Sequence, residues 1–282
     1  ISSSKTLGAI LPHHLGALLS DYYVKVVAGV TDALVETDYS LKLLLLKGER
    51  EKWDHYNFRV GEAVDGAIVI HRHSCFSNEA VFERLGMPCV VIDDPNPQLQ
   101  AHCVAGDNRL GGALAGRYLA EKGHRRIAVL TGPPGSIDSR LRLEGLMYSF
   151  RHLPAQPRLT VRTAYYVQES AREVVTTLLK NRDAITAIFC CNDDMALGAL
   201  EALRQLGLRC PGDVSVIGYD DDARAALADP PLTTIRVPLY AMAQEAARCL
   251  VRYLAGEHPL GFFQGCTLFP VELVERASVG SC

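Results

Sequence analysis

The sequence predicts an α/β protein made of two doubly wound, parallel-sheet lobes. Short, uniformly apolar runs alternate with longer amphipathic segments along all 282 residues. Such runs, bounded by turn residues, are typical of strands buried on both faces of a parallel sheet. Repeated strand–helix units imply right-handed crossovers, and seven or more strands over this length fit two lobes better than one. No long polar or Gly/Ser linker separates the lobes, so we expect short crossing strands to join them.

The individual elements follow from this alternation in chain order. The apolar runs predict strands at 7–11, 41–46, 67–70, 89–92, 127–130, 187–191 and 214–218. The segments between them predict helices at 21–37, 52–62, 77–86, 108–122, 139–152, 169–181, 194–206 and 239–255. Residues at the helix ends support the pattern. Asp107 or Asn108 can cap the helix that begins near 108, and Gly123 and Gly207 each follow the last residue of a helix.

Composition and charge exclude several classes of protein. A chain that is 48% hydrophobic and 22% charged has ample material for a packed core, which excludes disorder. The net charge is −3 and the 29 Lys and Arg residues are scattered, so this stretch has no cluster of basic residues that would bind nucleic acid. No apolar run approaches the roughly 18 residues that cross a bilayer, and the start lacks the layout of a signal peptide. We therefore expect no membrane association.

The nine cysteines indicate a reducing environment. Their number is odd, no CxxC pair occurs, and no Cys/His cluster has the spacing of a zinc site. Cys89, Cys103 and Cys190 lie inside apolar runs, where a free thiol behaves as a small hydrophobe. Reduced thiols favour a cytoplasmic protein, and the spacing predicts no bound metal.

Motifs that would identify an enzyme are missing from the sequence. There is no GxGxxG after a strand, no GxxxxGK(S/T) loop, no GxSxG elbow and no HExxH. The loop 131–136 follows a strand and could present backbone N–H groups to an anion, but a plain strand-to-helix turn is the simpler interpretation. We expect neither catalysis nor a cofactor.

Polar residues follow almost every predicted strand. In open parallel sheets, ligands bind outside the carboxyl ends of the strands. The candidates at these positions are His13, Asp93, Asn192 and Asp220. Their oxygen and nitrogen atoms can exchange several hydrogen bonds with a hydroxyl-rich ligand. One of residues 192–194 must also cap the helix that they open, and Asp193 or Asp194 is expected in that role.

Other side chains add two candidates to the strand-end residues. Arg142, in the segment SRLRLEG, can donate a bidentate pair of hydrogen bonds. Tyr166 or its neighbour Tyr165 can stack on the face of a sugar or a base. Together these residues predict a binding site for a small molecule rather than a catalytic centre.

Three stretches of the chain resemble the effector-binding core of the LacI–GalR repressors. They are DNRLGGALAGRYLAEKGHRRIAVL at 107–130, LTGPPGSIDSRLRLEGL at 130–146, and the segment 187–238 with its motifs NDDMALGA, VIGYDD and PPLTTI. The combination is far more specific than any one piece, and the resemblance runs from about Thr6 to Glu275. Periplasmic sugar-binding proteins share the fold, but these motifs resemble the repressors more.

The resemblance implies a periplasmic-binding-protein-like type I fold. Two lobes would be joined by three crossovers, with an effector in the cleft between the lobes. The N-terminal lobe would take residues 6–104 and 238–265, and the C-terminal lobe would take residues 105–237 and 266–276. The family begins with a helix-turn-helix headpiece that reads operator DNA. We expect that headpiece to be missing from this stretch of chain.

The resemblance also implies roles for individual residues. Arg142 matches the arginine that clamps the ligand, Asn192 an asparagine that contacts the effector, and Asp220 the cleft aspartate of the GYDD motif. Tyr166 matches an aromatic residue that packs on the ligand ring, and Asp93 matches a carboxylate after the fourth strand. The remaining candidates are the aromatic pair Tyr22 and Tyr23, and His13, which replaces the usual aspartate.

These implications predict the sensor domain of a DNA-binding transcriptional regulator, expected to be a repressor. It would act as a homodimer, bind a small sugar-like effector, and alter operator binding through the missing headpiece. The alternative is an exported periplasmic solute-binding protein that hands a sugar to a transporter. An upstream helix-turn-helix would support the first interpretation, and an upstream signal peptide the second.

Overall fold

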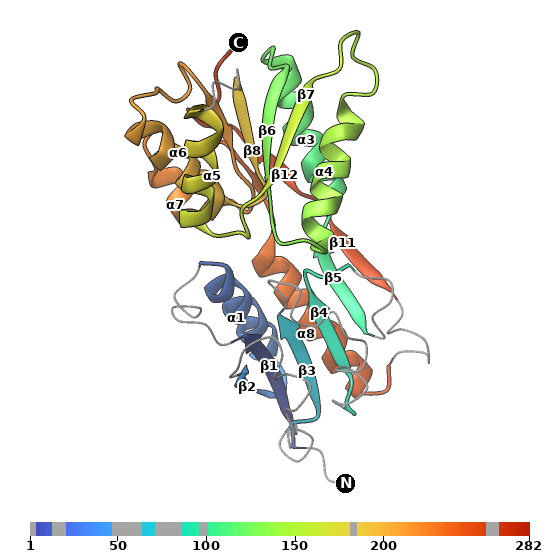
Figure 1. Cartoon of the computed structure of the whole chain (residues 1–282). Helices are drawn as coiled ribbons and strands as arrows, with labels where there is room; N and C mark the ends of the chain where they lie inside the picture. The colour runs from blue at the N-terminus through green and yellow to red at the C-terminus, as the bar shows by residue number, and fades with distance from the viewer. Residues whose placement is uncertain are drawn as a thin grey trace. The chain divides into compact units, whose positions relative to one another are not determined.

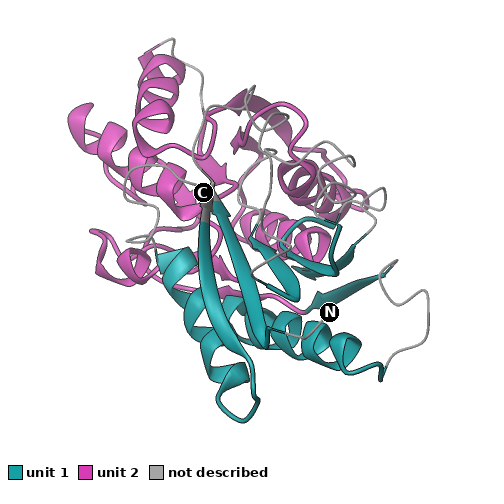
Figure 2. Ribbon diagram, turned by 90° about the horizontal axis from the view of Figure 1, so that it is seen from below, with its two compact units in different colours: residues 1–106, 238–269 teal, residues 107–237, 270–282 magenta. Residues whose placement is uncertain are grey.

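A computed structural model describes residues 4–12, 21–46, 64–70, 86–95, 101–180, 185–257 and 265–282. The chain forms two compact units, which Figure 2 shows in different colours. Unit 1 comprises residues 1–106 and 238–269, and unit 2 comprises residues 107–237 and 270–282. The chain therefore passes between the units three times. The predicted α/β class with parallel sheets is confirmed in both units.

Unit 1 is built on a six-stranded sheet with the order β11-β5-β4-β3-β1-β2 (Figure 1), in which every neighbouring pair is parallel. Its strands are β1 (Thr6–Pro12), β2 (Ser40–Leu46), β3 (Gly66–Ile70), β4 (Cys89–Ile92), β5 (His102–Gly106) and β11 (Cys266–Phe269). β3, β4 and β5 are buried at every residue; the first two are apolar throughout, whereas β5, which the apolar pattern does not predict, begins with the buried His102. The helices α1 (Asp21–Leu34) and α8 (Leu239–Leu254) pack together, and α8 also contacts these three strands.

Unit 2 contains a four-stranded parallel sheet with the order β7-β6-β8-β9. Its strands are β6 (Arg126–Thr131), β7 (Arg158–Thr163), β8 (Ala187–Cys190) and β9 (Ser215–Ile217). Its helices are α3 (Asn108–Glu121), α4 (Ile137–Ser149), α5 (Gln168–Lys180), α6 (Asp193–Gln205) and α7 (Ala223–Leu227). Helix α3 packs on α4, and α5 packs on α6. A small antiparallel pair, β10 (Thr234–Arg236) with β12 (Glu272–Val274), completes the unit.

Strand β7 is one that the apolar pattern does not predict. It forms an edge of the sheet in unit 2, and its sequence RLTVRT mixes charged and apolar residues. None of its residues is fully buried. Because only strands covered on both faces need a continuous apolar run, an edge strand of this kind escapes a search for such runs.

Residues 266–269 lie in a different unit from the one that the sequence analysis expects. The expectation places them in the C-terminal lobe, but they form β11, which pairs in parallel with β5 of unit 1. The pairing extends to the preceding residue, since the backbone N–H of Cys103 donates to the carbonyl of Gly265 at 2.9 Å. The expected helix at 52–62 and nearly all of the one at 77–86 lie outside the described residues.

Residues that the sequence predicts at the two ends of α3 are found there. Asp107 caps α3 by accepting a 2.9 Å hydrogen bond from the N–H of Leu110. Gly123 follows the helix with a φ of 92°, a backbone conformation that glycine adopts without strain. Within the described ranges, no helix combines the length and the apolar character needed to cross a membrane.

Candidate functional site

Arg142 is the centre of a buried polar cluster in unit 2. It projects from α4, and its side chain is 4% exposed. Its Nε donates to Oδ1 of Asn108 at 2.7 Å, and its Nη1 donates to the backbone carbonyl of Cys191. The guanidinium carbon also lies 3.8 Å from the ring centroid of Tyr219, a cation–π contact. The start of α3 and the segments after β8 and β9 therefore converge on one positive charge.

Two carboxylates lie close to this charge. Oδ1 of Asp220 is 4.0 Å from Nη1 of Arg142. Asp138, in the first turn of α4, accepts a 2.9 Å hydrogen bond from Nδ2 of Asn108, the amide whose oxygen holds Arg142. Burial acts to lower the pKa of Arg142, but the nearby Tyr219, Asp220, Tyr166 and Asp138 together outweigh it, so this pKa lies well above its ordinary value. Arg142 is thus a fixed positive charge with two acidic neighbours.

Tyr166 is held by its hydroxyl group at the same edge of the sheet. It follows β7, and its hydroxyl oxygen lies 2.7 Å from the Oγ atoms of both Ser136 and Ser139. The loop after β6, considered above as an anion site, has its N–H groups at Gly132 and Ser136 bonded within the protein, to Ser139 Oγ and the Pro133 carbonyl. This loop is a strand-to-helix turn, as the simpler interpretation predicts.

We expect Tyr166→Phe to lower the free energy of unfolding by about 1–2 kcal/mol, because the hydroxyls of the buried Ser139 and the half-buried Ser136 lose a partner while the ring remains. Its neighbour Tyr165 is 54% exposed and offers a matched control. Tyr165→Phe is expected to change the free energy by less than about 0.5 kcal/mol. Urea unfolding of both variants measures the difference, and equal values for the two would contradict a role for the Tyr166 hydroxyl.

Backbone strain is concentrated at this edge of unit 2. The described non-glycine residues with positive φ are Lys5, Asp93, Tyr165, Tyr166, Asp220 and Asp221. Four of these six follow β7 or β9. Left-handed backbone is costly for residues with a side chain and is found preferentially at functional sites. At Asp220, where φ is 117°, the N–H donates to the carbonyl of Ile235 at 2.8 Å and fixes the strained turn.

Asn192 is the cap of α6, and the prediction that Asp193 or Asp194 caps this helix is wrong. Oδ1 of Asn192 accepts a 2.9 Å hydrogen bond from the N–H of Met195, and its Nδ2 donates to the carbonyl of Tyr166 at 3.2 Å. Asp194 instead forms a 2.6 Å ion pair with Arg224. Asparagine and aspartate cap helices about equally well, so composition alone could not separate three consecutive candidates.

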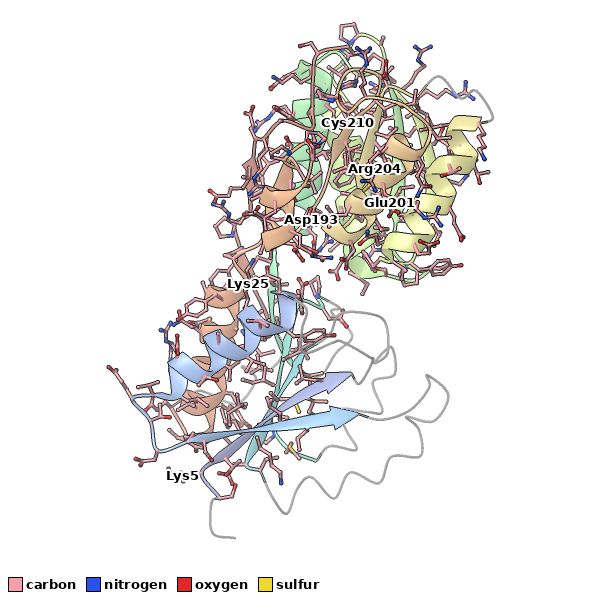
Figure 3. The ribbon with its side chains drawn as sticks, turned by 90° about the vertical axis from the view of Figure 1, so that its left-hand side faces the viewer. Lys5, Lys25, Asp193, Glu201, Arg204 and Cys210 are labelled. Atoms are coloured by element: carbon pink, nitrogen blue, oxygen red, sulfur yellow. The ribbon has the colours of Figure 1, made fainter. Side chains whose placement is uncertain are left out.

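Asp193 is a buried carboxylate that is hydrogen-bonded to the loop after β9. It is 1% exposed and begins α6, at the opposite end from Arg204 (Figure 3). It accepts hydrogen bonds from the N–H of Asp222 at 2.8 Å and from Oγ1 of Thr234 at 2.7 Å. Burial raises its pKa well above the ordinary value, and the charge of Asp220 adds to the shift. Asp193 therefore positions the segment that carries Asp220.

We expect Asp193→Asn to be more stable than the wild type at pH 8, by a margin that shrinks on acidification. The folded-state pKa of Asp193 lies above the unfolded value of 3.8, so the fold favours the protonated form. Its stabilising contribution is complete below 3.8 and is lost as the pH rises through the raised pKa. An asparagine keeps both hydrogen bonds if Thr234 becomes the acceptor.

Urea unfolding of the two proteins at pH 5, 6.5 and 8 measures this margin. Asp193→Ala is the companion variant, since it removes both hydrogen bonds and is expected to cost about 1–3 kcal/mol. A margin for Asp193→Asn that stays constant with pH would show that the carboxyl group of Asp193 titrates normally.

The other candidates from the sequence lie in unit 1 or outside the described residues. Tyr22 and Tyr23 stand in the first turn of α1, both buried, with ring centroids 5.3 Å apart in an edge-to-face arrangement. Asp93 follows β4, is 7% exposed, and has a φ of 66°. His13 lies outside the residues that the structure describes.

The structure adds residues to the cluster that sequence reasoning did not assign to it. Asn108 begins α3 two residues after β5, a strand that the apolar pattern does not predict, and Asp138 lies in the first turn of α4. Tyr219 does follow β9, so the strand-end rule could have found it, but its contact with Arg142 is visible only in three dimensions. No signal in the sequence singles out Ser136 or Ser139.

This arrangement is suited to binding. It brings the guanidinium of Arg142 on α4 together with residues that follow β7, β8 and β9, and the ends of parallel strands are the usual position of ligands in open sheets. Across the described residues, no group of three His, Cys, Asp or Glu side chains is arranged to hold a metal ion.

Comparisons with known proteins place the chain in a family. The periplasmic binding protein-like domain matches residues 117–279, more than half of the chain. The transcriptional regulator reg1 of Streptomyces lividans is 38% identical over 210 residues, which are 71% of this chain and 59% of that protein. The ribose operon repressor of Escherichia coli K12 is 31% identical over 277 residues, 94% of this chain and 82% of that protein.

A solved structure agrees with these relatives. The complex of the transcriptional regulator CelR with cellobiose superposes with a TM-score of 0.87 at 29% identity, covering 98% of this chain and 85% of that one. The match to reg1 spans only 59% of that protein, so its full-length activity does not transfer directly. The fold and the sequence resemblance nevertheless agree, and the chain belongs to the LacI family of transcriptional regulators, of which it contains the effector-binding core.

Proposed function

We propose that the chain is the effector-sensing part of a cytoplasmic transcription repressor, which binds a neutral, sugar-like ligand through the Arg142 cluster. The observation that carries the proposal is the cluster itself: a buried guanidinium held by Asn108 and flanked by Asp138 and Asp220 at the carboxyl edge of a parallel sheet. Its donors and acceptors match the hydroxyl groups of a sugar. Because the relatives are transcriptional regulators, an exported solute-binding protein and an enzyme are both disfavoured.

The charges of the cluster favour a neutral ligand over an anionic one. One guanidinium stands beside two carboxylates, Asp138 and Asp220, and its Nε and Nη1 already donate within the protein. A phosphate or carboxylate group would meet no surplus of positive charge and would be repelled by the acidic side chains. The CelR relative is seen with cellobiose, a neutral sugar, which supports the same class of ligand.

The ligand would regulate DNA binding by its differential affinity for two states of the protein. Operator DNA would be read by a helix-turn-helix headpiece elsewhere in the full-length protein, and two copies would contact two half-sites at a fixed spacing. We propose a homodimer for this reason. Leu227 on α7 is 85% exposed, and a large apolar side chain of this kind is suited to a partner surface.

Thermal melting against a panel of neutral sugars, their phosphates and purines tests the proposal. A ligand at about 100 times its dissociation constant stabilises a protein by about 2.7 kcal/mol, enough to raise Tm by a few degrees. Asp220→Asn is expected to weaken binding by about 1–3 kcal/mol, because it leaves ligand hydroxyls and Arg142 with a poorer partner. Asp213→Asn, which alters a surface ion pair with Arg209, is the control. The absence of any stabilising ligand, or equal affinity in both variants, would contradict the proposal.

A further inference from the structure

Cys103 and Cys266 are neighbours on adjacent strands of unit 1. Strands β5 and β11 pair in parallel, and these two cysteines are direct partners in the register. Partners on neighbouring strands lie roughly 4.7–4.9 Å apart in the hydrogen-bonding direction. A disulfide spans Cα separations of about 4.4–6.8 Å, so the backbone spacing suits one.

The two thiols also share a face of the sheet. Nε2 of His102 lies 3.0 Å from Oγ1 of Thr267, so these two side chains meet on one face. Successive residues of a strand point to opposite faces. Cys103 and Cys266, each adjacent in sequence to one of that pair, must therefore both point to the other face.

The chemical environments of the two thiols differ in a way that suits disulfide formation. Cys266 is exposed, whereas Cys103 is 4% exposed. The contact between the thiols raises the pKa of Cys103 and lowers that of Cys266, although burial and the charges of Asp93 and Asp94 oppose the lowering at Cys266. A thiolate is the reactive form, and an accessible low-pKa cysteine beside a second thiol is the usual arrangement of a redox-sensitive pair.

The two other cysteines that the structure describes in unit 1 lack these properties. Burial raises the pKa of Cys89 and that of Cys249 to about 12, and both side chains are buried. Such thiols stay protonated and poorly accessible, so they react slowly with oxidants. Among the described cysteines of unit 1, the reactivity is therefore expected to be selective for Cys266.

We propose that Cys103 and Cys266 form a reversible disulfide when the protein meets hydrogen peroxide. The Cys266 thiolate attacks one peroxide oxygen, and the O–O bond breaks to give a sulfenic acid and hydroxide, which takes up the proton lost from Cys266. The Cys103 sulfur then displaces the sulfenic hydroxyl group, which leaves as water with the Cys103 proton. Two thiols are oxidised to one disulfide, and one peroxide is reduced to two water molecules.

The bond would join the two strands of unit 1 that lead directly into connections between the units. The chain leaves unit 1 just after Gly106, at the end of β5, and again just after Phe269, at the end of β11. Oxidation would therefore tie together covalently the two strands from which these connections start. This inference does not depend on the proposed ligand or on DNA binding.

Peptide mapping of the chain tests the proposal without any variant. The fully reduced protein is treated with a small molar excess of hydrogen peroxide, its remaining thiols are blocked with N-ethylmaleimide, and it is digested with trypsin without reductant. We expect a linked pair of peptides containing Cys103 and Cys266, an intact mass lower by two hydrogen atoms, and loss of both after dithiothreitol. Cys89 and Cys103 share one tryptic peptide, so fragmentation spectra must assign the bond.

Three variants sharpen the result. Cys266→Ser is expected to remove the linked peptide, and Cys89→Ser, the matched control, to retain it in full. In Cys103→Ser the sulfenic acid has no partner, so dimedone is expected to label Cys266. Recovery of Cys103 and Cys266 as blocked thiols after peroxide, a link from Cys266 to any other cysteine, or an unchanged linked peptide in Cys103→Ser would each overturn the proposal.

Discussion

Replacing Arg142 with methionine is expected to lower the free energy of unfolding by about 3–5 kcal/mol and to abolish binding of the proposed ligand. Methionine keeps much of the length of the side chain but removes the charge and all its N–H donors. The Asn108 amide oxygen, the Cys191 carbonyl and the Asp220 carboxylate then lose their common partner inside the protein. The loss is large because a buried polar group without a partner retains its full desolvation cost.

Arg140 provides the matched control for this substitution. It lies two residues earlier on α4, its side chain is 57% exposed, and it forms a 2.8 Å ion pair with Glu144. Arg140→Met is expected to change the free energy of unfolding by less than about 1 kcal/mol, since exposed ion pairs contribute little. Urea unfolding measures stability, and calorimetry with a ligand from the melting screen measures binding. Similar unfolding midpoints for the two variants would refute the central role of Arg142.

Gly112→Ala is expected to destabilise the protein by about 1–3 kcal/mol or more. In the interior of an exposed helix, the same change stabilises by about 1 kcal/mol, because alanine is the better helix former. Here an added Cβ would overlap the backbone carbonyl oxygen of Arg142, where α3 and α4 approach closely. The helices would have to separate, and the Nε–Oδ1 hydrogen bond between Arg142 and Asn108 would lengthen.

A second substitution by alanine, at an exposed position of α3, separates the effect of steric crowding from that of helix propensity. Arg117 is on α3 with a side chain 66% exposed, and Arg117→Ala is expected to change stability by less than about 0.5 kcal/mol. Thermal and urea unfolding of both variants give the comparison. If Gly112→Ala unfolds at a higher urea concentration than the wild type, the two helices do not approach as closely as described.

Much of the fold could be predicted because its central strands are buried on both faces. Strands β3, β4, β6 and β8 carry short, uniformly apolar runs, and the prediction places each within one residue of its observed bounds. The equally buried β5 is not predicted, because His102 and Gly106 leave it only three consecutive apolar residues. The edge strand β7 was missed since exposure allows charged residues in it. Residues 266–269 were placed in the wrong lobe because strand pairing is a long-range property, and nothing in four residues shows which partner they bond to.

The sequence predicted several residues of the candidate site but not the hydrogen bonds that link them. The rule that ligands bind at strand ends selected Asp220 and Asn192, and the structure places them near Arg142 and Tyr166 in unit 2. The sequence could not show which of residues 192–194 caps α6, because three residues with similar capping ability follow one another. Asp138 went unnoticed because its importance comes from Asn108, 30 residues earlier in the chain.

The internal bonding of Arg142 limits what a ligand gains from two of its N–H groups. A ligand that recruits Nε or the bonded N–H of Nη1 must displace Asn108 or the Cys191 carbonyl as acceptor, so there it gains only the difference between the bonds it makes and the bonds it displaces. Residues that never touch the ligand can therefore tune its affinity by competing for Arg142 more or less strongly. Where Asn108 is the acceptor released, it lies in the first turn of α3, next to the residue where the chain enters unit 2. Ligand binding would then change the hydrogen bonds of Asn108, beside the point where the chain enters unit 2.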